Sequence, residues 1–150
     1  MPNAPAKAGF HSSEEQDQAR IAVIDDERDI CLMLGEFFRR LGYDTETFSD
    51  AREALDRIRA ESFDVVFTDI YMPGMTGIKI LEEIMGLERN ILVILMTGQP
   101  TLEDTISAVR LGAYDYLTKP FNLDLLELMV NRAVQQRRLV SENIAYHNYL

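Results

Sequence analysis

Residues 20–26 read RIAVIDD, an arginine and four apolar residues that run directly into two aspartates. A continuous apolar run of this length is typical of a strand buried on both faces of a parallel sheet. Two adjacent carboxylates are costly to bury unless a cation or hydrogen bonds compensate their charge. The stretch therefore predicts a central strand over residues 21–24 that holds Asp25 and Asp26 at its carboxyl end.

Four further segments have the composition of short strands. They cover residues 44–48, 65–68, 91–96 and 114–117. The segments 65–68 and 91–96 are almost entirely apolar, as expected of buried strands, whereas 44–48 (DTETF) alternates and is typical of an edge strand.

Segments with apolar residues at three- and four-residue spacing alternate with these strands, as expected of amphipathic helices. They cover residues 30–41, 51–58, 77–85 and 101–111, and a fifth begins after Asn122. The predicted stop signals are Gly42, Gly86 and Gly112, and the predicted caps are Thr101 paired with Asp104, and either Ser49 or Asp50. Five alternations predict one domain, an open parallel α/β sheet with right-handed crossovers and helices on both faces.

The composition of the 150 residues is ordinary for a globular domain, with 47% hydrophobic and 27% charged residues. A net charge of −10 argues against binding nucleic acid or an anionic membrane through overall charge. The single cysteine, Cys31, excludes an internal disulfide and fits a reducing compartment. No apolar stretch is long enough to span a membrane, so we expect a cytoplasmic protein. Residues 1–19 have little to bury and no apolar segment, and we expect a disordered tail rather than a secretory signal.

Polar residues follow four of the predicted strands at their carboxyl ends. Asp25 and Asp26 follow the first strand, Asp69 the third, Thr97 the fourth and Lys119 the fifth. Ligands of open α/β sheets bind at this edge. Taken singly, such an aspartate is commonly a turn residue or a cap, and such a lysine a solvated charge, so the inference rests on their joint placement.

Three carboxylates within hydrogen-bonding range would repel by roughly a few kcal/mol per close pair at an effective dielectric constant near 20. A hard divalent cation such as Mg²⁺ relieves this repulsion, because it prefers oxygen ligands. One carboxylate can then attack a phosphoryl group and form an aspartyl phosphate. Asp69 is the best candidate for this nucleophile, since it ends the central strand, and Lys119 would help to neutralise the phosphoryl oxygens.

At these positions the chain resembles the receiver domain of two-component response regulators, over roughly residues 20–139. Five motifs carry the resemblance, in the expected order: VIDDE at 23–27, TDIYMPGMTG at 68–77, MTG at 96–98, Tyr116, and LTKPF at 117–121. The resemblance implies a flavodoxin-like, doubly wound sheet of five parallel strands in the order 2-1-3-4-5, with an extended C-terminal helix.

The resemblance also implies a role for each site residue. Asp69 is the phosphoacceptor, and Lys119 contacts the phosphoryl group. Asp26 and Asp69 bind Mg²⁺ or Mn²⁺ directly, Asp25 acts mostly through water, and the backbone carbonyl of Tyr71 supplies another ligand.

The same resemblance implies a conformational switch. Thr97 moves to hydrogen-bond a phosphoryl oxygen, Tyr116 rotates into the space that Thr97 leaves, and a partner reads the surface of the fourth helix, fifth strand and fifth helix. The alternative for Tyr116 is a strand aromatic that packs on the fourth helix. The bond between Lys119 and Pro120 is expected to be cis. Tyr71 and Gln99 are less typical of the family, and such flanking positions affect how long the phosphoryl group survives.

Both histidines, His11 and His147, lie near the ends of the chain, so the phosphoryl group is expected to come from a sensor histidine kinase or a phosphotransfer protein. Residues 140–150 are predicted to extend the last helix. Apolar residues at steps of three and four suggest a coiled-coil seam that dimerises or leads to an output domain. Its eight positions are Leu123, Leu126, Val130, Ala133, Arg137, Val140, Ile144 and His147. The alternative is a first half that packs on the sheet and a frayed linker. The end of the chain resembles the linkers of multidomain regulators. This resemblance implies an output domain such as a cyclic-dinucleotide phosphodiesterase or a transcription-activating ATPase.

The leading hypothesis is thus a switch that catalyses its own phosphorylation and dephosphorylation, not an enzyme with a small-molecule product. A metal-dependent phosphohydrolase of the haloacid-dehalogenase kind would need a second acid where Tyr71 stands. A flavin carrier would need a phosphate cradle where the chain has Asp25 and Asp26. A docking scaffold without phosphorylation would not need the intact site.

Overall fold

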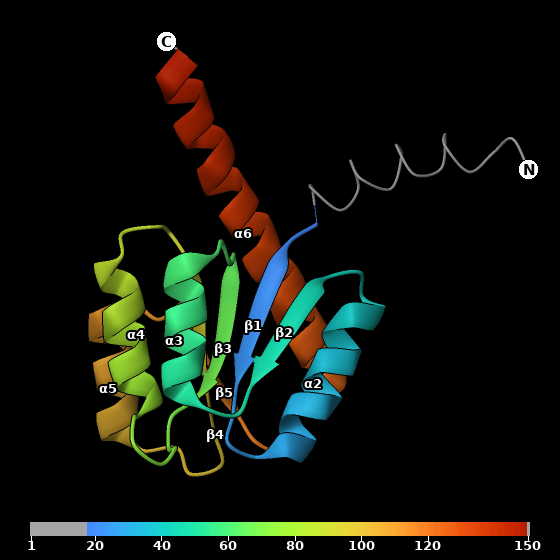
Figure 1. Cartoon of the computed structure of the whole chain (residues 1–150), viewed down its shortest axis with the longest axis vertical. Coiled ribbons are helices and arrows are strands. Elements are labelled where there is room, and N and C mark those ends of the chain that lie inside the picture. Colours follow the sequence, from blue (N-terminus) through green and yellow to red (C-terminus); the bar gives the residue numbers. More distant parts are fainter. Residues whose placement is uncertain (1–17, 150) are drawn as a thin grey trace, which may run out of the picture.

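Five parallel strands form a single sheet in the computed structural model, which describes residues 18–149 of the chain and the side chains of residues 18–142. The strands are β1 (Arg20–Ile24), β2 (Asp44–Phe48), β3 (Val65–Asp69), β4 (Leu92–Thr97) and β5 (Asp115–Thr118). They lie in the order β2-β1-β3-β4-β5, so β3 is central and β2 is an edge (Figure 1). The predicted flavodoxin-like fold is confirmed. The predictions for residues 1–17, including His11, and for the side chains of Ile144 and His147 lie outside the described part.

The helices form a layer on each face of the sheet. They are α2 (Arg28–Arg40), α3 (Ala51–Ala60), α4 (Gly77–Gly86), α5 (Leu102–Leu111) and α6 (Leu123–Tyr149). One apolar cluster joins the sheet to α2 and α6, and a second joins it to α3, α4 and α5. In Figure 1 the two layers lie to the right and to the left of the sheet. None of the helices within residues 18–149 combines the length and hydropathy that crossing a membrane requires.

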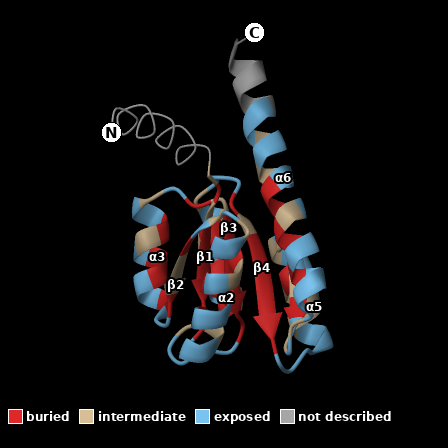
Figure 2. Ribbon diagram, turned by 90° about the vertical axis from the view of Figure 1, so that its right-hand side faces the viewer, coloured by how far each residue is buried: buried red, intermediate tan, exposed pale blue. Residues whose placement is uncertain are grey.

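The buried strands explain why the site is held rigidly. Every residue of β3 is buried, and so is every residue of β1 and β4 after the first, as the red strands in Figure 2 show. Successive residues of β1 point to opposite layers: Val23 enters the cluster under α2 and α6, and Ile24 the cluster under α3, α4 and α5. Strands fixed from both sides in this way give their carboxyl ends little freedom to move.

Local signals set most of the helix ends. The Asp50 carboxylate accepts from the backbone N–H of Arg52 at 2.9 Å, so Asp50 rather than Ser49 caps α3. Gly112 ends α5 in the left-handed region, at φ 90°. α4 ends at Gly86, one residue past the predicted end at Met85. Gly86 is not in the left-handed region, and the left-handed turn comes at Glu88, which adopts a φ of 55°.

The first part of α6 belongs to the core of the domain. Leu126, Val130 and Ala133 are fully buried against the sheet. These positions are therefore unable to form the predicted coiled-coil seam, which corrects that part of the hypothesis. The Tyr43 hydroxyl donates to Asn131 Oδ1 at 2.5 Å and also holds α6 against the domain.

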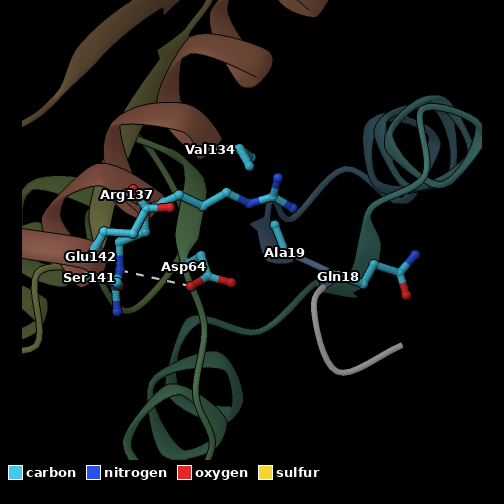
Figure 3. Close-up of a pocket in the computed structure, with 8 residues that line it drawn as sticks. Gln18, Ala19, Asp64, Val134, Arg137, Ser141 and Glu142 are labelled. Atoms are coloured by element: carbon cyan, nitrogen blue, oxygen red, sulfur yellow. Dashed lines mark hydrogen bonds and ion pairs between the residues drawn. The ribbon is translucent and has the colours of Figure 1, made fainter. Parts of the chain in front are cut away.

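A cavity of about 460 Å³ lies where α6 leaves the sheet, at the amino-terminal ends of the strands. Asp64 and Arg137 face each other across it, with 3.8 Å between Asp64 Oδ1 and Arg137 Nε (Figure 3). This ion pair joins the residue before β3 to the last part of α6 that contacts the sheet. The cavity is at the opposite end of the sheet from the acidic residues.

Candidate functional site

Three aspartates meet at the carboxyl ends of β1 and β3. Asp69 is the last residue of β3, and Asp25 and Asp26 follow β1, its neighbour in the sheet. One carboxylate oxygen from each of the three lies within 4.8 Å of the others. The predicted gathering of these three acids is confirmed.

The three acids differ in their contact with solvent. Asp25 is fully buried and Asp69 is 6% exposed, whereas Asp26 is exposed. The cluster therefore opens to solvent on the Asp26 side. Three oxygen donors, one of them open to water, fit a hard divalent cation such as Mg²⁺, which retains water ligands.

Lys119 compensates part of the negative charge. Its Nζ lies 2.6 Å from Asp25 Oδ2 and 3.5 Å from Asp69 Oδ2. Burial opposes the charge on Lys119, but the hydrogen bond to Asp25 and the nearby carboxylates outweigh it, so the pKa of Lys119 is raised. Lys119 therefore stays charged at neutral pH. The Lys119–Pro120 bond is cis, as predicted.

Asp69 carries the electrostatic cost of the crowding. Burial raises the pKa of Asp69, and the charge of Asp25 raises it further. Lys119 and the backbone N–H of Tyr71 offset part of this increase. A positive charge placed beside Asp69 would therefore stabilise its ionised form.

Asp25 is held by three contacts around the end of β1. Its N–H donates to the carbonyl of Phe48 at 3.0 Å, and its Oδ1 accepts from the N–H of Glu27 at 2.9 Å. The Cys31 thiol donates to the Asp25 carbonyl at 3.2 Å. Burial raises the pKa of Cys31, which keeps the thiol protonated as a donor.

Cys31 and Glu27 were not predicted as part of the site. The carboxylate of Glu27 lies 3.8 Å from Lys119 Nζ, although the side chain is 64% exposed. The third acid of the VIDDE motif was the available signal for Glu27. Nothing in the sequence indicated the contact of Cys31.

Gly77, the first residue of α4, positions the backbone that carries Asp69. Its N–H donates to the carbonyl of Ile70 at 2.8 Å. A Cβ at position 77 would lie 2.2 Å from the backbone carbonyl oxygen of Asp69. Only glycine allows α4 to start so close to the end of β3.

The two predicted switch residues lie on neighbouring strands, β4 and β5. Thr97 is fully buried, and its Oγ1 accepts from the N–H of Gln99 at 3.1 Å. The Tyr116 hydroxyl is buried and has no hydrogen-bond partner within the described residues. The Tyr116 ring packs against the cluster under α3, α4 and α5. Its rotation on phosphorylation remains a prediction.

A sequence profile described as "Response regulator receiver domain" matches residues 21–131 of this chain. The chain is 40% identical over 131 residues to the regulatory protein AtoC of Escherichia coli (strain K12), covering 87% of this chain and 28% of AtoC. The chain spans little more than a quarter of the length of the curated relatives that it matches.

Two solved structures extend the likeness to the fold. A response regulator receiver domain protein from Clostridium thermocellum has 35% identity and a TM-score of 0.76, over 81% of this chain and 98% of that one. The beryllofluoride-activated NtrC4 receiver domain dimer has 30% identity and a TM-score of 0.75, over 79% and 98%. An independent phosphohydrolase is not favoured. Residues 21–131 thus form a receiver domain, and the chain belongs to the response regulators of two-component signalling.

Proposed function

We propose that Asp69 accepts a phosphoryl group from a sensor histidine kinase or phosphotransfer protein, in a reaction that requires Mg²⁺ or Mn²⁺. The observation that carries the proposal is the meeting of three carboxylates and one lysine at the end of the central strand. Keeping these charged side chains together costs folding free energy. A cation and a phosphoryl group would interact with all four of them.

The chemistry follows from the positions of the side chains. A carboxylate oxygen of Asp69 attacks the phosphorus atom, and the bond from phosphorus to the donor breaks with its electron pair leaving on the donor. Lys119 Nζ, which lies 3.5 Å from Asp69 Oδ2, donates to a phosphoryl oxygen. A divalent cation held by Asp26, Asp69 and the backbone carbonyl of Tyr71, with Asp25 acting through water, would supply further positive charge.

Asp69→Asn should abolish phosphorylation, because an amide is unable to form the acyl phosphate. The measurement is incorporation of phosphate from acetyl phosphate with MgCl₂, followed by intact-protein mass spectrometry. Asp56→Asn is the matched control, because Asp56 is 80% exposed on α3. This variant should be phosphorylated on Asp69 to the same extent as the wild type. Equal modification of the Asp69→Asn and wild-type proteins would refute the assignment.

Magnesium should stabilise the wild-type domain against urea, by about 2.7 kcal/mol at one hundred times its dissociation constant. Asp26→Asn should lower the affinity about tenfold or more, because it removes an oxygen ligand that faces solvent. Asp29→Asn, an exposed acid in the first turn of α2, controls for the loss of one charge. A similar magnesium response in both variants would argue against the predicted site.

We further propose that the domain acts as a switch and not as an enzyme with a small-molecule product. In the proposal, phosphorylation moves Thr97 and Tyr116, and a partner recognises the changed surface of α5, β5 and α6.

The relatives AtoC and DctD bear names of regulatory and transcriptional regulatory proteins, which supports a transcription-controlling output domain and a cytoplasmic location. The dimeric state of the activated NtrC4 receiver domain supports homodimerisation as a second mode of output. A receiver unit over residues 20–139, followed by a helical extension, accords with the profile match at 21–131.

A further inference from the structure

Tyr71 connects the end of the phosphoacceptor strand with α5. It lies two residues after Asp69, the last residue of β3. Its side-chain hydroxyl donates to Asp104 Oδ2 in the first turn of α5. One residue therefore connects the end of β3 with a helix that is 33 positions further along the chain.

Asp104 is itself fixed to the start of α5. Its N–H donates to Thr101 Oγ1 at 3.1 Å, so Thr101 caps the helix as predicted. The sequence also predicted that the pair would resemble a capping box, in which the acidic side chain turns back to the cap residue. Instead, the Asp104 carboxylate turns toward the Tyr71 hydroxyl.

α5 is the helix for which such a contact matters most. Ala108 is its one buried residue among 102–111, all of which the structure describes. Leu102 and Val109 are 77% and 74% exposed. In Figure 1, α5 lies beside α4 at the outer side of its layer. A helix with so little buried apolar surface moves at low cost, and a single hydrogen bond can bias its position.

A second connection reaches α5 from the other side of the site. Thr97 ends β4, the loop 98–101 follows, and Thr101 then caps α5. In the proposed function, Thr97 moves toward the phosphoryl group, and the loop and the first turn of α5 move with it. Tyr71 remains attached to the end of β3, which is buried throughout. A movement of the first turn of α5 past a stationary Tyr71 changes the distance between the Tyr71 hydroxyl and the Asp104 carboxylate.

We propose that the Tyr71–Asp104 hydrogen bond is a latch that holds α5 in its resting position and opens when Asp69 carries a phosphoryl group. The proposal rests on the proposed function of Asp69. Tyr71 is in this respect a positioning residue, because its phenol acts on α5 and not on the phosphoryl group. A latch that must open opposes activation, so its removal favours the activated state.

The test is the affinity for beryllofluoride in the presence of excess Mg²⁺, measured by isothermal titration calorimetry on the full chain. Tyr71→Phe removes only the hydroxyl, and Asp104→Ala removes only the acceptor. Each should tighten binding about threefold to tenfold, the range that corresponds to one hydrogen bond of ordinary net strength. The double variant should gain no more than either single variant, because both break the same contact.

Two further variants separate the latch from a general structural effect. Asp104→Asn keeps an oxygen acceptor for the Tyr71 hydroxyl and should stay closer to the wild type than Asp104→Ala. Glu103→Ala removes a charge from the same helical turn and should leave the affinity unchanged. A structural role alone would lower the urea midpoint without this pattern of affinities.

The outcomes distinguish the latch from the function on which it rests. Wild-type protein that fails to bind beryllofluoride with Mg²⁺ overturns the proposed function and, with it, the latch. Wild-type binding with unchanged or weaker binding by Tyr71→Phe and Asp104→Ala overturns the latch alone. Gains that add in the double variant also overturn it, since independent effects would then be at work.

Discussion

Gly77→Ala should destabilise the domain by about 3 kcal/mol, the upper part of the usual range for overpacking a tight site. The new methyl group would lie 2.2 Å from the Asp69 carbonyl oxygen, and 2.9 Å from both Asp69 C and Ile70 Cα. All three are backbone atoms at or next to the end of a buried strand. Neither this backbone nor the start of α4 can therefore move easily to make room for the methyl group. Urea unfolding followed by circular dichroism measures the loss.

Gly86→Ala is a control in the same helix. A Cβ at position 86 meets no atom within 4 Å, so the substitution should be neutral or stabilise α4 by up to about 1 kcal/mol. Gly77→Ala should also weaken Mg²⁺-dependent beryllofluoride binding, because Asp69 is displaced. Equal urea midpoints for the two alanine variants would show that α4 can start elsewhere without cost.

Lys119→Met should have a comparably large effect on both stability and chemistry. Without Lys119, the fully buried carboxylate of Asp25 loses the cation at 2.6 Å. Removing one partner of a buried ion pair costs about 3–5 kcal/mol, and we expect the lower figure in the metal-free protein at pH 7. Added Mg²⁺ should restore part of the loss, since it supplies positive charge to the same acids.

The rate of phosphorylation by acetyl phosphate should fall at least about a hundredfold in Lys119→Met, the usual effect of removing one donor to a transferring group. Lys79→Met is the matched control. Lys79 is about half exposed and pairs with Glu82 and Glu83 on the surface of α4. Its loss should cost less than about 0.5 kcal/mol and leave the rate unchanged. Similar losses of stability and rate in Lys119→Met and Lys79→Met would argue that the three aspartates do not need the positive charge of Lys119.

The strands and the acidic site could be predicted because strands buried on both faces have a recognisable apolar sequence. β1, β3 and β4 are apolar almost throughout, and each predicted strand lies within one residue of the observed one. Once the strands are parallel and adjacent, their carboxyl ends meet, so Asp25 and Asp69 were predictable as neighbours. Lys119 followed from the same argument applied to β5.

Other features could not be predicted, because they depend on contacts between distant residues. The turn after α4 uses Glu88 and Asn90 at positive φ, a conformation that non-glycine residues rarely adopt and that no sequence pattern marks. The predicted seam failed in the first part of α6, because a stripe that faces a sheet and one that faces a second helix have nearly the same spacing. The contact between Tyr71 and Asp104 joins two distant segments with no local signature.

The course of α6 separates two ends of the molecule. Asp69 lies where the strands finish, whereas α6 passes Asp64 and leaves the domain where they begin, at the top of Figure 1. The five residues of β3 put roughly 16 Å between these ends. In the proposed function, phosphoryl transfer would therefore engage one end of the sheet. A protein that binds the projecting turns of α6 would engage the other end.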